Sequence, residues 1–148
     1  MSLENTISDA IKTAMREKDK IALDSLRAVK AQILLLKTEA KGAEVSAEQE
    51  IAILQRMIKQ RKDSFEQFTA QGRNDLAEVE DAQMKVIEKF LPKQLSAEEL
   101  ELEIRKIISE TGAESMKDLG KVMGTASKAL AGKSDGKSIS EMVKKLLS

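Results

Sequence analysis

Apolar residues recur at intervals of three and four along almost the whole chain, and no segment alternates apolar and polar residues for long enough to indicate a half-buried strand. In the first segment they stand at Leu3, Ile7, Ile11 and Ala14, which form one stripe along a helix. The sequence therefore predicts an all-α protein in which each helix buries one face.

Capping residues divide the first two thirds of the chain into helices. Asp19 is a favourable N-cap for a second helix, which we expect to end near Gly42. Ser46 and Gln49 have the spacing of a capping box and predict the start of a third helix, which stops at Gly72. The apolar positions of the third and fourth helices are Ile51, Leu54, Ile58, Phe65, Phe68, Leu76, Val79, Val86, Ile87, Phe90 and Leu91.

The single proline, Pro92, disfavours helical conformation in the residue before it and marks a predicted domain boundary. We predict an N-terminal domain of about four helices at residues 1–92 and a small C-terminal domain of three helices at residues 96–148. The three expected starts of these short helices are Ser96 with Glu99, Ser115 with Asp118, and Ser138 with Glu141. The stretch from Gly132 to Ser138 is predicted to be a loop.

Composition excludes several kinds of chemistry. The 148 residues include no Cys, His, Trp or Tyr, so thiol and imidazole catalysis and the usual transition-metal ligands are absent. Any catalysis would rest on Ser, Thr, Lys or carboxylates, and because no motif of the chain supplies such a site we predict no catalytic residue, no metal and no cofactor. The N-terminal residues carry frequent charges and no long apolar run, so we expect a cytoplasmic protein without a membrane partner.

Two Gly-Lys-Ser triplets, beginning at Gly132 and Gly136, invite comparison with a P-loop. That motif needs a glycine five positions before its Gly-Lys pair, and Ser127 and Ala131 stand there instead. Ser134 and Lys137 have the spacing of a serine–lysine dyad, but the intervening Asp135-Gly136 favours a turn rather than the helix start that such a dyad uses. The sequence thus predicts no nucleotide hydrolase and no serine nucleophile.

Charge is unevenly distributed although 25 basic residues balance 25 acidic ones. Residues 96–114 contain two basic and six acidic residues, whereas residues 115–148 contain seven lysines and three acidic residues. Lys117, Lys121 and Lys128 are predicted to share one side of a helix next to a glycine-containing loop. They either contact phosphates or form an ordinary solvated face; without an aromatic residue among them, contact would depend on shape and charge.

Several short runs occur in a recognisable order. They are Leu26-Arg27-Ala28-Val29-Lys30, Arg61-Lys62-Asp63-Ser64-Phe65-Glu66-Gln67-Phe68, Gly72-Arg73-Asn74-Asp75-Leu76-Ala77 with Glu80, Phe90-Leu91-Pro92-Lys93-Gln94-Leu95-Ser96, Gly112-Ala113, Lys117-Asp118-Leu119-Gly120-Lys121-Val122-Met123-Gly124 and Gly132-Lys133-Ser134-Asp135-Gly136-Lys137. With these runs, over nearly its whole length, the chain resembles the GatB/YqeY family.

This resemblance implies a helical protein similar to the C-terminal tail of the glutamyl/aspartyl-tRNA amidotransferase B subunit. That tail engages tRNA, while the chemistry of the enzyme lies on other domains. Carbon–nitrogen ligase activity with glutamine as amido-N-donor is therefore implied only by association. The tRNA-binding residues carried over from the resemblance are Lys117, Lys121, Lys128, Lys133 and Lys137.

We accordingly expect a tRNA-amidotransferase-like accessory protein that binds tRNA weakly, together with a protein partner in tRNA metabolism, and that has no catalytic site of its own. Weak binding is expected because a chain of zero net charge lacks a long-range field toward nucleic acid. The alternative is an interaction adaptor that docks a translation or metabolic enzyme without nucleic acid.

Overall fold

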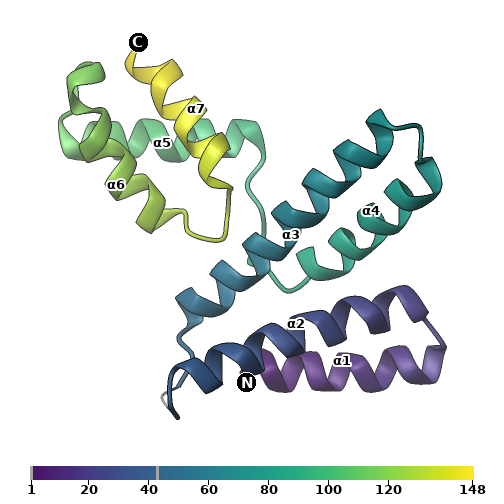
Figure 1. The fold of residues 1–148 in the computed structure, drawn as a ribbon. Coiled ribbons are helices and arrows are strands. Elements are labelled where there is room, and N and C mark those ends of the chain that lie inside the picture. The colour runs from purple at the N-terminus through teal and green to yellow at the C-terminus, as the bar shows by residue number, and fades with distance from the viewer. Residues whose placement is uncertain (1, 43) are drawn as a thin grey trace. The chain divides into compact units, whose positions relative to one another are not determined.

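The computed structural model describes residues 2–42 and 44–148, and every regular element in those ranges is helical (Figure 1). The predicted all-α class is therefore confirmed. Contacts within the chain cluster into two compact units, one ending at Leu91 and the other spanning Pro92–Ser148.

The first unit contains four helices: α1 (Leu3–Glu17), α2 (Lys20–Glu39), α3 (Ala47–Ala70) and α4 (Asn74–Glu88). Helix α1 packs along α2, α3 packs along α4, and α2 also contacts both α3 and α4. Figure 1 shows the two pairs as antiparallel hairpins. The buried residues that join them are Ile7, Ala14, Leu26, Val29, Ile33, Ile53, Leu54, Met57 and Ile87.

The apolar pattern predicted these buried faces well for α1 and less well for α3 and α4. Ile7 and Ala14 are buried as expected. On α3, Ile53 and Met57 join the predicted Leu54 in the core. On α4 the prediction was wrong for Val79, which is 41% exposed, because Ala77 faces the core instead.

Capping in the first unit follows the sequence closely. The Asp19 carboxylate accepts a hydrogen bond from the Ala22 backbone N–H at 3.0 Å. The capping box is complete: the Ser46 hydroxyl accepts from the Gln49 N–H at 3.1 Å, and the Gln49 side-chain oxygen accepts from the Ser46 N–H at 2.9 Å. These bonds satisfy donors that an α-helix leaves unpaired in its first turn, so they fix where α2 and α3 begin.

The second unit contains α5 (Ala97–Thr111), a short 3₁₀ turn η1 (Met116–Asp118), α6 (Leu119–Ala129) and α7 (Gly136–Leu147). Each of its three α-helices contacts the other two. Their buried residues form one core, consisting of Leu100, Ile104, Ile107, Val122, Ala126, Leu130, Ile139, Val143 and Leu147. This core is smaller than that of a typical domain, so each of these side chains matters to the stability of the unit.

Helix α5 has the predicted capping box and a left-handed C-cap. The Ser96 hydroxyl accepts from the Glu99 N–H at 3.1 Å, and the Glu99 carboxylate accepts from the Ser96 N–H at 3.2 Å. Hydrogen bonding to the backbone N–H of Ser96 lowers the pKa of the Glu99 carboxyl below its usual range. Gly112 ends the helix at φ +70°, a conformation that glycine adopts without strain.

The other two predicted helix starts in this unit were wrong. Ser115 caps only the 3₁₀ turn, and the Asp118 carboxylate accepts from the Glu114 N–H rather than from Ser115. Ser138 lies inside α7, whose N-cap is Asp135; its carboxylate accepts from the Ser138 N–H at 2.6 Å. At α7 the Asp135 carboxylate caps the helix three residues before Ser138, so residues 136–138 are helix rather than loop.

Candidate functional site

The five lysines predicted to bind tRNA all lie in the second unit, and all are exposed. Lys117 belongs to η1, Lys121 and Lys128 to α6, Lys133 to the turn after α6, and Lys137 to the first turn of α7. We call these five residues the lysine surface. The ion pairs found among the described residues use other cations, namely Lys37 with Glu4, Arg73 with Asp75, Lys85 with Asp81 and Arg105 with Glu101.

The lysine surface is less regular than the sequence suggested. Lys121 and Lys128 are seven residues apart on α6, so they project within about 20° of each other. Lys117 lies in the preceding 3₁₀ turn, so the prediction that it shares a helix with them was wrong. Tighter winding of that turn changes the direction of its side chain relative to α6.

Lys121 has a structural role that the sequence did not indicate. Its ammonium donates a hydrogen bond to the Thr111 carbonyl at 3.0 Å. Thr111 is the last residue of α5, where backbone carbonyls have no partner within the helix and where a positive charge is favourable. Lys121 therefore joins α6 to the C-terminal end of α5, and only part of its donor capacity faces solvent.

A second basic cluster, on α3, is largely used for packing. The Arg56 guanidinium donates to the Gln32 side chain on α2 at 2.9 Å. Arg61 donates to the Gln83 side chain on α4 at 3.2 Å and to the Met57 carbonyl at 3.2 Å. These arginines connect α3 to its neighbours, although Arg56 remains exposed, as do Lys59 and Lys62.

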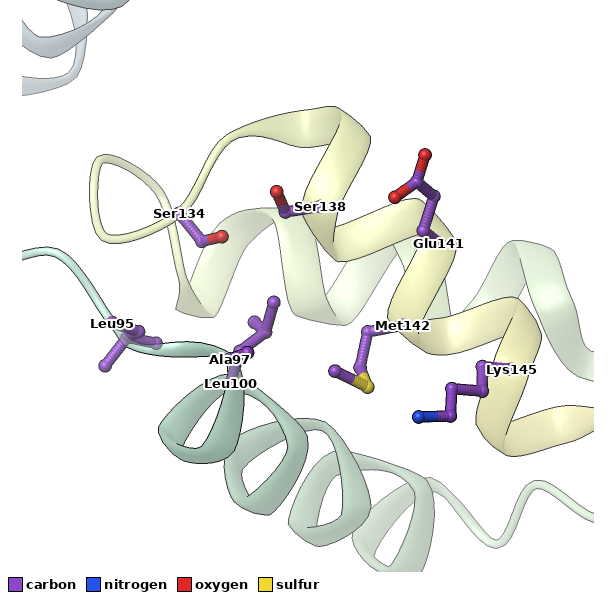
Figure 2. A pocket seen from close by; sticks show the side chains of 8 residues that line it. All are labelled: Leu95, Ala97, Leu100, Ser134, Ser138, Glu141, Met142 and Lys145. Atoms are coloured by element: carbon purple, nitrogen blue, oxygen red, sulfur yellow. The ribbon is translucent and has the colours of Figure 1, made fainter.

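A hollow of about 330 Å³ lies between the start of α5 and one side of α7 (Figure 2). Its apolar lining comes from Leu95, Leu100 and Met142, and its polar lining includes Ser134 and Lys145. Sequence reasoning missed this hollow because its residues come from three separate segments. The only signal of the hollow in the sequence was Lys145, a basic residue beside apolar residues near the C-terminus, and such residues are too common to indicate a site.

The turn that carries Ser134 is held in place by the segment before α5. The Leu95 N–H donates to the Lys133 carbonyl at 2.8 Å, and the Gln94 side-chain amide donates to the Gly132 carbonyl at 2.5 Å. The Ser134 N–H itself donates to the Leu130 carbonyl at 3.4 Å. One wall of the hollow is thus fixed to the other by one backbone and one side-chain hydrogen bond.

The structure changes the argument against a serine–lysine dyad. Asp135 and Gly136 form a helix start rather than an isolated turn, so that prediction was wrong. The described hydrogen bonds of Ser134 and Lys137 include none that joins the two residues. In the described part of the chain, no group of three or more acidic residues is arranged to hold a metal ion.

Comparison with known proteins gives a consistent family. The sequence profile of the family described as "Yqey-like protein" matches residues 4–147. One relative, "Altered inheritance of mitochondria protein 41, mitochondrial" of Pyrenophora tritici-repentis, is 30% identical over 139 residues, covering 93% of this chain and 76% of that protein. The chain therefore belongs to the YqeY-like protein family.

Other relatives carry the same printed name. That of Meyerozyma guilliermondii is 37% identical over 92 residues, which cover 59% of this chain and 45% of that protein. That of Lachancea thermotolerans is 28% identical over 95 residues, covering 64% of this chain and 51% of that protein. The chain thus matches about half the length of these two relatives. These proteins are mitochondrial by name, and no described helix of this chain is long and apolar enough to cross a membrane.

Proposed function

We propose that this YqeY-like protein binds tRNA through the lysine surface of its second unit and acts as an accessory protein without turnover of its own. The observation that carries the proposal is the exposure of all five lysines on a segment, residues 115–148, that has seven lysines against three acidic residues. A local excess of positive charge of this kind attracts the phosphate backbone.

Weak, salt-dependent binding is the expected behaviour. The chain as a whole has zero net charge, so long-range attraction is small and affinity depends on direct contacts. Each phosphate contacted by a lysine releases about one counterion, and affinity therefore falls steeply with salt. A protein partner in tRNA metabolism would add the contacts needed at cellular ionic strength. We place this activity in the cytoplasm.

Amide transfer by the isolated chain is not part of the proposal. Carbon–nitrogen ligation with glutamine as amide donor needs a nucleophile to release ammonia and a site that activates a carboxylate. The chain has no Cys to act as that nucleophile and no His to assist it, and the lysine surface, which consists of lysines alone, provides neither the nucleophile nor the activating site. We expect purified protein incubated with glutamine, ATP and charged tRNA to form no amide above the background without protein.

The experiment that tests the proposal is a titration of labelled bulk tRNA with the whole protein at several salt concentrations. The informative variant is Lys117→Glu/Lys128→Glu, because Lys121 also caps α5 and its replacement would disturb the fold. The control variant is Lys12→Glu/Lys20→Glu, which makes the same change in net charge at exposed lysines of the first unit.

We expect saturable binding by the unmodified protein. The slope of log affinity against log salt concentration should become shallower by about two in the first variant and stay unchanged in the control. Equal losses in both variants would show that net charge alone governs binding and would contradict the assignment to the second unit. Absence of binding by the unmodified protein at low salt would overturn the proposal itself.

One observation favours a second candidate, a protein-interaction adaptor. Leu34 and Leu35 near the end of α2 are 45% and 53% exposed, and Leu35 borders a hollow of about 340 Å³ between α2 and α3. Exposed apolar groups beside a hollow are typical of protein interfaces. If the adaptor is correct, Leu35→Ser should abolish capture of a partner enzyme while Lys117→Glu/Lys128→Glu leaves it intact.

A further inference from the structure

The hollow of the second unit has a positively charged end and a hydroxyl end. Figure 2 shows the Lys145 ammonium extending from α7 into the space between that helix and α5, with Met142 beside it and Ser134 at the opposite end. The α7 residues that line the hollow run from Ser138 to Lys145, which is about 10 Å at the helical rise of 1.5 Å per residue. The hollow is therefore elongated, with Leu95, Leu100 and Met142 as apolar walls along its length.

Lys145 points into this hollow although a local partner is available. Glu141 precedes it by four residues, which is the favourable order for an ion pair on a helix. Asp81 with Lys85 and Glu101 with Arg105 have the same spacing and form ion pairs at 2.9 Å and 3.0 Å. In α7, by contrast, Glu141 also lines the hollow, and Figure 2 shows its carboxylate directed away from Leu100 and from the Lys145 ammonium.

Ser134 supplies the second polar group. It is only 9% exposed, and its side chain lines the hollow. Within the described residues no hydrogen bond engages its hydroxyl, which still reaches the open space and so is not a sealed, unsatisfied group. Because buried hydroxyls normally have a partner, this one is available to a ligand. Its position is fixed by the bonds from Leu95 and Gln94 to the same turn.

We propose that the hollow binds a single ribonucleotide unit, with its phosphate against Lys145, its base edge on the Ser134 hydroxyl, and its sugar and base face over the apolar walls. An ammonium recognises phosphate, a hydroxyl both donates to and accepts from sugar hydroxyls and base edges, and an apolar wall accommodates a base face. A volume of about 330 Å³ is at the lower end of small-molecule sites, which suits one nucleotide.

The choice of a nucleotide over other elongated anions rests on the proposed function, since the surrounding segment is rich in lysine and is expected to meet RNA. The hollow is nevertheless separate from the lysine surface, because none of the five lysines lines it. A free mononucleotide and a nucleotide within single-stranded RNA offer the same chemistry, so the experiment includes both.

The test is a nuclear magnetic resonance titration of the ¹⁵N-labelled whole protein. The ligands are 5′-AMP, adenosine, inorganic phosphate and a four-residue single-stranded RNA. The variants are Lys145→Met, with Lys144→Met as its control on the same helix turn, and Ser134→Ala, with Ser127→Ala as a control on an exposed serine. The spectra also report directly whether each variant is folded.

We expect 5′-AMP or the RNA to shift the Ser134 and Lys145 amide signals saturably in the millimolar range, and adenosine and phosphate to bind more weakly. Loss of a charge-assisted hydrogen bond should weaken 5′-AMP about tenfold in Lys145→Met, and loss of a neutral one about threefold in Ser134→Ala. Both controls should stay within about twofold of the unmodified protein.

If the protein binds the RNA but not 5′-AMP, or 5′-AMP but not the RNA, the result identifies the source of the nucleotide and supports the inference. Equal loss in Lys144→Met and Lys145→Met, phosphate binding as tightly as 5′-AMP, or no saturable shift up to about 20 mM would overturn it. Failure here leaves the tRNA titration of the lysine surface unaffected, and failure of that titration leaves nucleotide binding in the hollow measurable.

Discussion

Three positions on α5 allow the core of the second unit to be tested with nearly constant chemistry. Leu100, Leu102 and Ile104 each lose three side-chain carbons when replaced by alanine. Their exposures differ widely, at 4%, 69% and 0%. Leu100 also borders the hollow, whereas Ile104 is enclosed by other core residues. Differences in stability among the three variants therefore report the environment rather than the size of the deletion.

The expected magnitudes follow from burial. Removing three buried carbons costs about 2.4 kcal/mol of transfer free energy at about 0.8 kcal/mol per methylene. Ile104→Ala also leaves an enclosed cavity, so its total should reach about 3–5 kcal/mol. Leu100→Ala extends a hollow that is already open, so its cost should stay near about 2–3 kcal/mol. Leu102→Ala should change stability by less than about 0.5 kcal/mol.

Hydrogen exchange of the whole protein, resolved by residue, is the suitable assay. A unit of fewer than about 60 residues has only a few kcal/mol of stability, so Ile104→Ala should expose amides throughout α5, α6 and α7 while those of α1 to α4 remain protected. Leu102→Ala serves as the matched control. A different order of the three variants would refute the burial argument, and equal loss of protection in α1 to α4 would refute independent stability of the second unit.

Three further predictions concern ends of helices in the second unit. Gly112→Ala should destabilise the unit by about 1–2 kcal/mol, because φ +70° is strained for alanine, whereas Gly124→Ala inside α6 should stabilise it by about 0.5–1 kcal/mol. Chemical denaturation measures both changes, and the same sign in both variants would contradict the backbone argument. Because the pKa of Glu99 is lowered in the folded protein, its carboxylate stabilises the fold above the ordinary glutamate pKa range, and this stabilisation is lost as pH falls through the folded pKa. The free energy of unfolding of Glu99→Gln, measured from about pH 6 to pH 2, should lack that loss. A pH profile identical to that of the unmodified protein would contradict the prediction. Lys121→Met should speed hydrogen exchange at the end of α5 around Thr111 while Lys121→Arg preserves protection, unless the ammonium plays no part in capping.

The sequence predicts helix ends well where one polar side chain dominates and poorly where two compete. Asp19 and Ser46 each stand alone before an apolar run, and each caps the predicted helix. Ser138 also has an acidic residue three positions later, but the Asp135 carboxylate accepts from the Ser138 N–H, so α7 begins at Gly136 and Ser138 lies inside its first turn. A capping pattern identifies a possible helix start, and tertiary packing decides which of two overlapping starts is used.

Core positions show the same limit. A stripe of four apolar residues defined the buried face of α1, because most of its other residues are polar. Helix α3 has apolar residues on more than one side, so Ile53 and Met57 could be recognised as core only once α2 and α4 were in contact with it. Val79 is exposed for the same reason, since the small Ala77 allows a close approach of neighbouring helices.

For the candidate binding residues, too, the sequence predicts the local charge but not the tertiary surroundings of each side chain. The count of lysines identified a basic segment but could not distinguish their environments. Lys121 bonds to the end of α5, Lys128 faces solvent, and Lys145 extends into a hollow that the turn at Ser134 closes at its other end. These differences arise from contacts between residues ten or more positions apart, which no local pattern contains.

The two proposed contacts with nucleic acid would contribute different quantities to binding. Contacts from the lysine surface are electrostatic and disappear as salt rises, whereas a base over apolar walls and a hydroxyl bond to Ser134 depend little on salt. With zero net charge the protein has little long-range attraction, so the residual affinity at high salt should come mainly from the hollow. Lys117→Glu/Lys128→Glu should therefore flatten the salt dependence of tRNA binding, while Ser134→Ala should lower affinity equally at all salt concentrations.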